Sequence, residues 1–86
     1  MAIDQSTVRD QIREFVQSLA SAKGIASFTD QEALLESGII DSLSIFRLVS
    51  FLEDTFRVRI GDQEITNENL KNVDTIEHLV LSKQGK

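Results

Sequence analysis

The sequence predicts an all-α fold: a small four-helix bundle of three long helices and a short third helix, with a long first loop. Apolar residues recur at helical spacing in separate segments, and the alternating run at 56–60 has no second such run with which to pair as a strand. The 86 residues suffice for a single domain over 1–86. Because the chain has no cysteine and no proline, its stability must come from apolar packing, and helix ends must be inferred from glycines and capping residues.

The first helix is expected over about residues 4–22, with Asp4 or Ser6 as its N-cap. Its apolar residues form one stripe at a period of 3.6 residues: Val8, Ile12, Phe15, Val16 and Leu19.

No periodicity continues through 23–38, and so long a connection is unusual in a small domain unless it is anchored or functional. We expect Phe28, Leu34 and Leu35 to anchor it. The T-D-Q-E run that begins at Thr29 fits a capping box and predicts one short helical turn before Gly38.

The second helix is expected over 42–56, with Asp41 as its N-cap. The Asp41 carboxylate would accept hydrogen bonds from the backbone N–H of Leu43 or Ser44. Phe46 and Phe51 fall at the flanks of the helix. The inner face shares the helical period and comprises Ile45, Leu48, Val49, Leu52 and Phe56.

The last third of the chain predicts an extended connection followed by two helices. The apolar residues of 56–60 are expected to fill the helical core, and 66–71 is expected to be the short third helix. A capping box from Asp74 to Glu77 predicts the start of the final helix, and Lys83 lies near its negative end.

Charge argues against several classes of ligand. Fourteen acidic and nine basic residues give a net charge of −5, which repels nucleic acid and favours basic partners. The start of the chain lacks a signal-peptide pattern, and no run approaches the roughly 18 apolar residues of a membrane span. We therefore expect an unprocessed, soluble, cytoplasmic monomer that binds no nucleic acid and does not span a membrane.

The sequence offers no catalytic residues and no metal site, so we expect a protein that is not an enzyme. The one histidine, His78, is adjacent to Glu77 but would point in a different direction on a helix, which favours a surface histidine. Histidine and cysteine clusters are absent, and the acidic pairs 53–54 and 62/64 lack the glycine-centred loop of a calcium site. We interpret these acidic pairs as solvated surface.

One run stands out, L-E-S-G-I-I-D-S-L at 35–43, which places a glycine turn and two aliphatic residues before a serine at the head of a helix. A phosphodiester on Ser42 would lie at the positive end of the helix dipole, beside backbone N–H groups that have no helical partner. A phosphate on Ser42 would therefore be tolerated without distorting the helix.

Leu43, together with Ile39 and Ile40, would form an apolar collar around this serine that a partner protein could contact. The alternative is structural: Asp41 would be an ordinary N-cap and Ser42 a tolerated residue of the first turn.

The run E-S-G-I-I-D-S-L, followed by S-I-F-R-L-V-S-F-L-E-D-T-F, resembles the acyl carrier proteins, which have Asp-Ser-Leu at the head of their second helix. The resemblance covers nearly the whole chain, including the L-L-E-S-G exit of the loop and the tail I-T-N-E-N-L-K-N-V-D-T-I-E-H-L-V. It implies that a phosphopantetheinyl transferase attaches 4′-phosphopantetheine from coenzyme A to Ser42 with magnesium. The terminal thiol would then hold an acyl or aminoacyl group as a thioester.

The resemblance also implies partners: a loading ligase for acyl or aminoacyl groups, and downstream synthase or transferase enzymes. Their recognition surface would comprise Asp41, Leu43, Phe46 and Arg47, along the exposed side of the second helix.

Two residues depart from the family's fatty-acid carriers. Ser44 and Arg47 stand where acidic residues are expected, and Arg47 would repel basic partner enzymes. The G-G-x-S form of peptidyl carriers is also absent. These departures predict a stand-alone carrier of a specialised biosynthetic pathway, with its cargo left open. A rival hypothesis of another class is an unmodified helical module that docks through its second helix.

Overall fold

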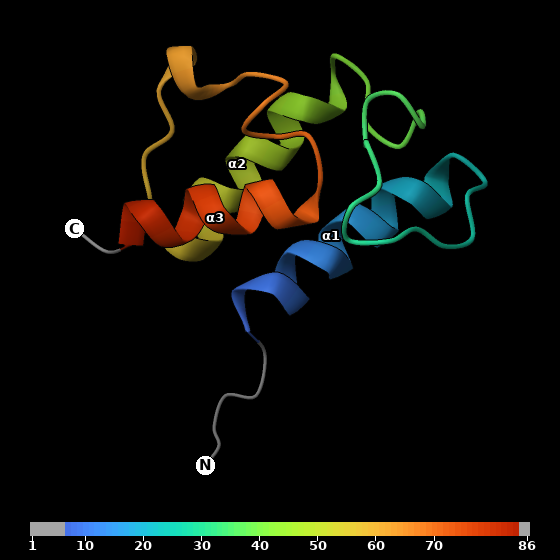
Figure 1. Cartoon of the computed structure of the whole chain (residues 1–86), viewed down its shortest axis with the longest axis horizontal. Helices are drawn as coiled ribbons and strands as arrows, with labels where there is room; N and C mark the ends of the chain where they lie inside the picture. Colours follow the sequence, from blue (N-terminus) through green and yellow to red (C-terminus); the bar gives the residue numbers. More distant parts are fainter. Residues whose placement is uncertain (1–6, 85–86) are drawn as a thin grey trace.

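The computed structural model describes residues 7–84, and this part of the chain is all-helical, without strands. It contains three α-helices, α1 (Val8–Ala22), α2 (Ser44–Phe56) and α3 (Val73–Gln84), and a 3-10 turn, η1 (Asp62–Glu64). All three helices pack against one another (Figure 1). None of the helices in the described range is long and apolar enough to cross a membrane.

Helix α1 begins after a threonine N-cap and ends at a glycine turn. Thr7 Oγ1 accepts a hydrogen bond from the backbone N–H of Asp10 at 3.0 Å, whereas the expected caps Asp4 and Ser6 lie outside the described residues. At the other end Gly24 adopts a left-handed φ of +79°, and the N–H of Ile25 donates to the carbonyl of Ala20. This turn ends the helix because glycine reaches that conformation without strain.

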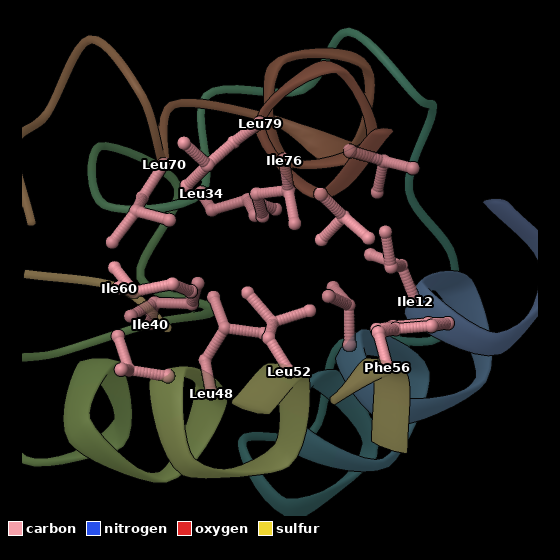
Figure 2. Close-up of a cluster of buried hydrophobic side chains, with 14 of the residues drawn as sticks. Ile12, Leu34, Ile40, Leu48, Leu52, Phe56, Ile60, Leu70, Ile76 and Leu79 are labelled. Carbon is pink, nitrogen blue, oxygen red and sulfur yellow. The ribbon is translucent and has the colours of Figure 1, made fainter. Parts of the chain in front are cut away.

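The core lies between the inner faces of α2 and α3 and is completed by the segments that connect the helices. Figure 2 shows Leu48 and Leu52 of α2 facing Ile76 and Leu79 of α3. Further buried residues come from α1 and the connections: Ile12, Val16, Ala20, Leu34, Ile39, Ile40, Val58, Ile60 and Leu70. The predicted inner faces of the three long helices therefore meet in one core.

The connection after α2 is extended, as predicted. Arg57 adopts a left-handed φ of +57° and ends the helix. Val58 and Ile60 then point into the core, while Arg59 is exposed. The backbone N–H of Ile60 donates to Glu53 Oε2 at 2.9 Å. This bond replaces the one that a neighbouring strand would otherwise provide.

The expected short helix at 66–71 is a turn in the structure. It contains a single helix-type backbone bond, from the N–H of Leu70 to the carbonyl of Thr66, and Leu70 is fully buried. The Thr66 hydroxyl accepts from the N–H of Asn69, and the Asn69 amide donates to the carbonyl of Glu64. These side-chain bonds compete with helix formation, so the segment stays a turn that places one leucine in the core.

The start of α3 differs from the prediction. Asn72 is the N-cap: its Oδ1 accepts from the N–H of Thr75 at 2.8 Å, and its own N–H donates to Thr75 Oγ1 at 3.1 Å. The predicted capping box from Asp74 to Glu77 is therefore wrong. Asp74 and Glu77 instead bind Arg9 of α1.

The long first loop is anchored, although not by all the residues expected. Leu34 is fully buried and its N–H donates to the carbonyl of Lys71, whereas Leu35 is 37% exposed and does not anchor the loop. Phe28 packs against the core beneath the guanidinium of Arg13. The predicted helical turn at Thr29 is only a tight turn.

An ionic cluster ties this loop to α1 and α3. Arg9 bonds to Asp30 and Glu77 at 2.6 Å each and also to Asp74, and Arg13 bonds to Asp30 at 2.7 Å. The hydrogen bonds that Arg9 donates to Asp74 and Asp30 raise the pKa of its guanidinium. One cation on α1 therefore holds the middle of the loop against the start of α3.

The two adjacent leucines of the loop provide a test of this anchoring. Leu34→Ala is expected to lower the free energy of unfolding by about 2–5 kcal/mol, because it leaves a cavity in the core. Leu35→Ala is the matched control and is expected to change it by less than about 0.5 kcal/mol. Urea denaturation of both variants measures the difference; equal effects would contradict the anchoring role of Leu34.

Candidate functional site

The head of α2 is closed by the carboxylate of Asp41. Its Oδ1 accepts hydrogen bonds from the backbone N–H of Leu43 at 3.0 Å and of Ser44 at 2.8 Å. The carbonyl of Asp41 also accepts from the N–H of Ile45 at 3.0 Å. The hydrogen bonds predicted for the Asp41 carboxylate are therefore confirmed. The helix itself begins at Ser44 rather than at residue 42, and Ser42 and Leu43 form the turn that leads into it.

Gly38 sets the direction in which the chain enters this cap. It adopts a left-handed φ of +87°, where a side chain would be strained even though the space around it is open. The turn before it is closed by a bond from the N–H of Ser37 to the carbonyl of Ala33 and by one from the N–H of Ile40 to the carbonyl of Leu34. The reversal sends the next two residues inward.

Those two residues, Ile39 and Ile40, do not belong to an exposed collar as the sequence suggested. They are 0% and 1% exposed, and Ile40 lies among the core side chains in Figure 2. Since the turn at Gly38 points both side chains into the core, neither can contact a partner in this arrangement. They fix the backbone immediately before Asp41 instead.

The remaining residues predicted for the site gather on the outer side of the first turns of α2. Ser42 and Arg47 are exposed, Leu43 is 77% exposed, and Phe46 is 61% exposed. Ser44 differs, because it is only 8% exposed and faces inward. The accessible hydroxyl of Ser42 is therefore bordered by apolar surface and one cation.

Lys23 is a member of the site that sequence reasoning missed. Its Nζ lies 2.8 Å from Asp41 Oδ2, so the end of α1 is joined to the start of α2. This contact, followed by the hydrogen bond from the Ser44 N–H, lowers the pKa of Asp41 well below its ordinary range. The sequence signal was weak because 17 residues separate the two partners, and the path of that loop decides whether they meet.

An open groove between α1 and α2 lies beside the site. Phe15 of α1 stacks on Phe51 of α2 with ring centroids 4.4 Å apart and planes at 12°. The groove is further lined by Leu19, Phe46, Arg47 and Ser50. The sequence placed Phe46 and Phe51 at the flanks of the second helix, but it could not show that α1 completes a groove with them.

The histidine and the acidic pairs that the sequence offered do not form a chemical site in the part of the chain that the structure describes. His78 is exposed, and residues 7–84 hold no group of three or more side chains suited to a metal ion. The acidic pairs are not simply solvated surface, since Glu53 accepts from a backbone N–H, and Glu64 binds Lys83 and the N–H of Gly61. These contacts with Lys83 and then Gly61 lower the pKa of Glu64.

Comparison with known proteins adds no assignment: no protein-family model matches the chain, and no match is found among curated proteins.

The Lys23–Asp41 contact makes a prediction about pH. Because the folded-state pKa of Asp41 is lowered, its contribution to stability is present above its ordinary pKa of 3.8 and is lost as pH falls through the folded-state value. Lys23→Gln is expected to raise the Asp41 pKa toward 3.8 and move this loss of stability to higher pH. The carboxyl ¹³C shift of Asp41, followed by NMR titration, measures the change.

Lys71→Gln is the control for that titration, because Lys71 is also exposed but has no ion pair within residues 7–84. It is expected to leave the Asp41 pKa unchanged. An Asp41 pKa that stays low in Lys23→Gln would show that the backbone N–H groups alone hold the carboxylate ionised.

Proposed function

We propose that this protein is a carrier that holds acyl or aminoacyl groups as thioesters on a 4′-phosphopantetheine arm attached to Ser42. The observation that carries the proposal is an exposed serine in the turn that opens α2, directly after an aspartate whose carboxylate accepts the N–H groups of Leu43 and Ser44. The proposed fold is the four-helix bundle of acyl carrier proteins, with the turn at 66–71 in the place of the third helix.

The modification needs little from the chain beyond an accessible hydroxyl. Ser42 Oγ would form a bond to the pantetheine-linked phosphorus of coenzyme A, the bond from that phosphorus to the nucleotide part would break, and the serine proton would pass to a base on the transferase. The adenosine bisphosphate leaves. When bound, the arm supplies a thiol for thioester chemistry, which a chain without cysteine does not have itself.

The charges and dipoles around Ser42 favour the resulting phosphodiester, but not through all the free backbone N–H groups that the sequence suggested. The Asp41 carboxylate already binds the N–H groups of Leu43 and Ser44, so these are not available to a phosphate. The N–H of Ser42 has no partner among the residues described, and the positive end of the α2 dipole acts on the same position. Lys23 balances the charge of Asp41, which reduces its repulsion of a phosphate.

The exposed side of α2 is proposed as the surface read by partners: the phosphopantetheinyl transferase, a loading ligase, and a downstream synthase or transferase. Leu43 and Phe46 offer apolar contact, and Arg47 adds a positive charge beside them. Basic enzymes that serve fatty-acid synthesis would be repelled by Arg47, so a specialised pathway is proposed.

The same apolar exposure favours one rival, an unmodified module that docks through α2. Intact mass spectrometry separates the two functions. After incubation with coenzyme A, magnesium and a broad-specificity transferase, we expect the wild type to gain one phosphopantetheine and Ser42→Ala to gain none.

Ser37→Ala and Ser44→Ala are the controls for this measurement and are expected to be modified like the wild type. A wild type that stays unmodified while a known carrier in the same tube is fully converted would refute the carrier function and leave the docking module.

The role of Arg47 in partner choice is tested by charge reversal. With basic housekeeping enzymes of fatty-acid synthesis, Arg47→Glu is expected to raise the rates of loading and transfer several-fold, most strongly at low salt. Arg59→Glu, an exposed reversal outside α2, is the control. If housekeeping enzymes load and use the wild type at the same rates as Arg47→Glu, selection by this residue is ruled out.

A further inference from the structure

The candidate attachment site lies just before the helix that forms one wall of the groove between α1 and α2. Phe46 and Ser50 are four residues apart on one face of α2 and both line the groove, while Ser42 lies in the turn two residues before the helix begins. The rise from Phe46 to Ser50 is about 6 Å at 1.5 Å per residue. Since helical side chains lean toward the N-terminus, Phe46 leans toward Ser42.

The groove combines apolar walls with a single charged residue. Its walls include the stacked rings of Phe15 and Phe51, together with Leu19 and the exposed ring of Phe46. Among its lining residues within 7–84, Arg47 alone is charged, and this guanidinium has no ion pair in that range. A planar guanidinium beside apolar surface suits a ligand that has both an apolar stretch and a carboxylate.

The core is a less favourable place for such a ligand. Leu48, Leu52 and Ile76 are fully buried, so a chain entering between α2 and α3 would have to separate faces that are already packed. The groove is open to solvent without any rearrangement. Covering the ring of Phe46, which is 61% exposed, would also remove apolar area from water.

We propose that the groove between α1 and α2 binds the acyl group carried on Ser42, and that this acyl group bears a carboxylate that pairs with Arg47. The inference rests on the proposed carrier function and narrows its cargo to half-thioesters of dicarboxylic acids or similar anionic acyl groups. The apolar part of the chain lies against Phe15, Phe46 and Phe51, and the carboxylate reaches the guanidinium.

The test compares two acyl groups of equal length on the full chain. A broad-specificity transferase loads Ser42 from adipoyl-coenzyme A or from hexanoyl-coenzyme A, and intact mass confirms the loading. In the adipoyl form we expect nuclear Overhauser contacts between the acyl methylenes and the rings of Phe46 and Phe51, and a shift of the Arg47 Nε–H resonance. In the hexanoyl form we expect these contacts to be several-fold weaker.

Variants separate the groove from nonspecific apolar contact. Arg47→Gln is expected to reduce the adipoyl contacts to the hexanoyl level, and Phe46→Ala to weaken the contacts to the remaining ring. Leu81→Ala is the matched control, because Leu81 is an exposed apolar residue on α3, outside the groove. It is expected to leave the adipoyl contacts unchanged.

The same experiments distinguish a failure of the groove proposal from a failure of the carrier proposal. A chain that loads, but whose acyl group contacts core residues such as Leu52 or only the vicinity of Ser42, would overturn the groove while leaving the carrier function intact. Equal contacts from both acyl groups, unaffected by Arg47→Gln, would overturn the pairing with a carboxylate. A Ser42 that cannot be loaded at all would refute the carrier function and, with it, this inference.

Discussion

The exposed position of Ser42 depends on the carboxylate of Asp41, whose two oxygens bind different parts of the structure. Oδ1 accepts hydrogen bonds from two backbone N–H groups in the turn that opens α2, while Oδ2 binds Lys23 at the end of α1. An isolated N-cap would satisfy the helix end only. Here the same residue also fixes the helix end relative to α1, so the hydroxyl of the next residue is held on the outer surface beside the groove that α1 and α2 form.

The loop between α1 and α2 holds Asp41 in this position. The left-handed turn at Gly38 drives Ile39 and Ile40 into the core, and the chain must emerge directly afterwards at Asp41. Earlier in the loop, Leu34 is buried and Asp30 is held by Arg9 and Arg13. A long loop usually implies conformational freedom, but this one is fixed at several points and can therefore position a site.

The features that the sequence predicted well are those with local causes. The three helical stripes, the Asp41 cap and the extended segment after Phe56 follow from spacing and capping chemistry within a few residues. Arg47 and Phe46 are exposed on α2, in line with the surface that the resemblance implied, while spacing alone had placed Phe46 at the flank of the helix. A helical period is enough to separate the inner face from the outer one.

The features that the sequence missed depend on tertiary structure. The sequence indicated a capping box from Asp74 to Glu77, whereas in the structure Asn72 is the cap and Asp74 and Glu77 bind Arg9 of α1. The position of Arg9 on another helix is not a local signal. Likewise, the inward direction of Ile39 and Ile40 follows from the path of a nonperiodic loop, and the groove exists only because Phe15 of α1 meets α2.

The two proposed uses of α2 are coupled through Phe46. Phe46 lines the groove and is 61% exposed overall, so a partner that buries it would compete with the proposed cargo for the same side chain. By linkage, cargo held in the groove would weaken partner docking, and a docked partner would weaken the hold on the cargo by the same factor. A carrier built this way would keep its cargo against its own surface between encounters and release it upon docking, without any helix having to separate from the core.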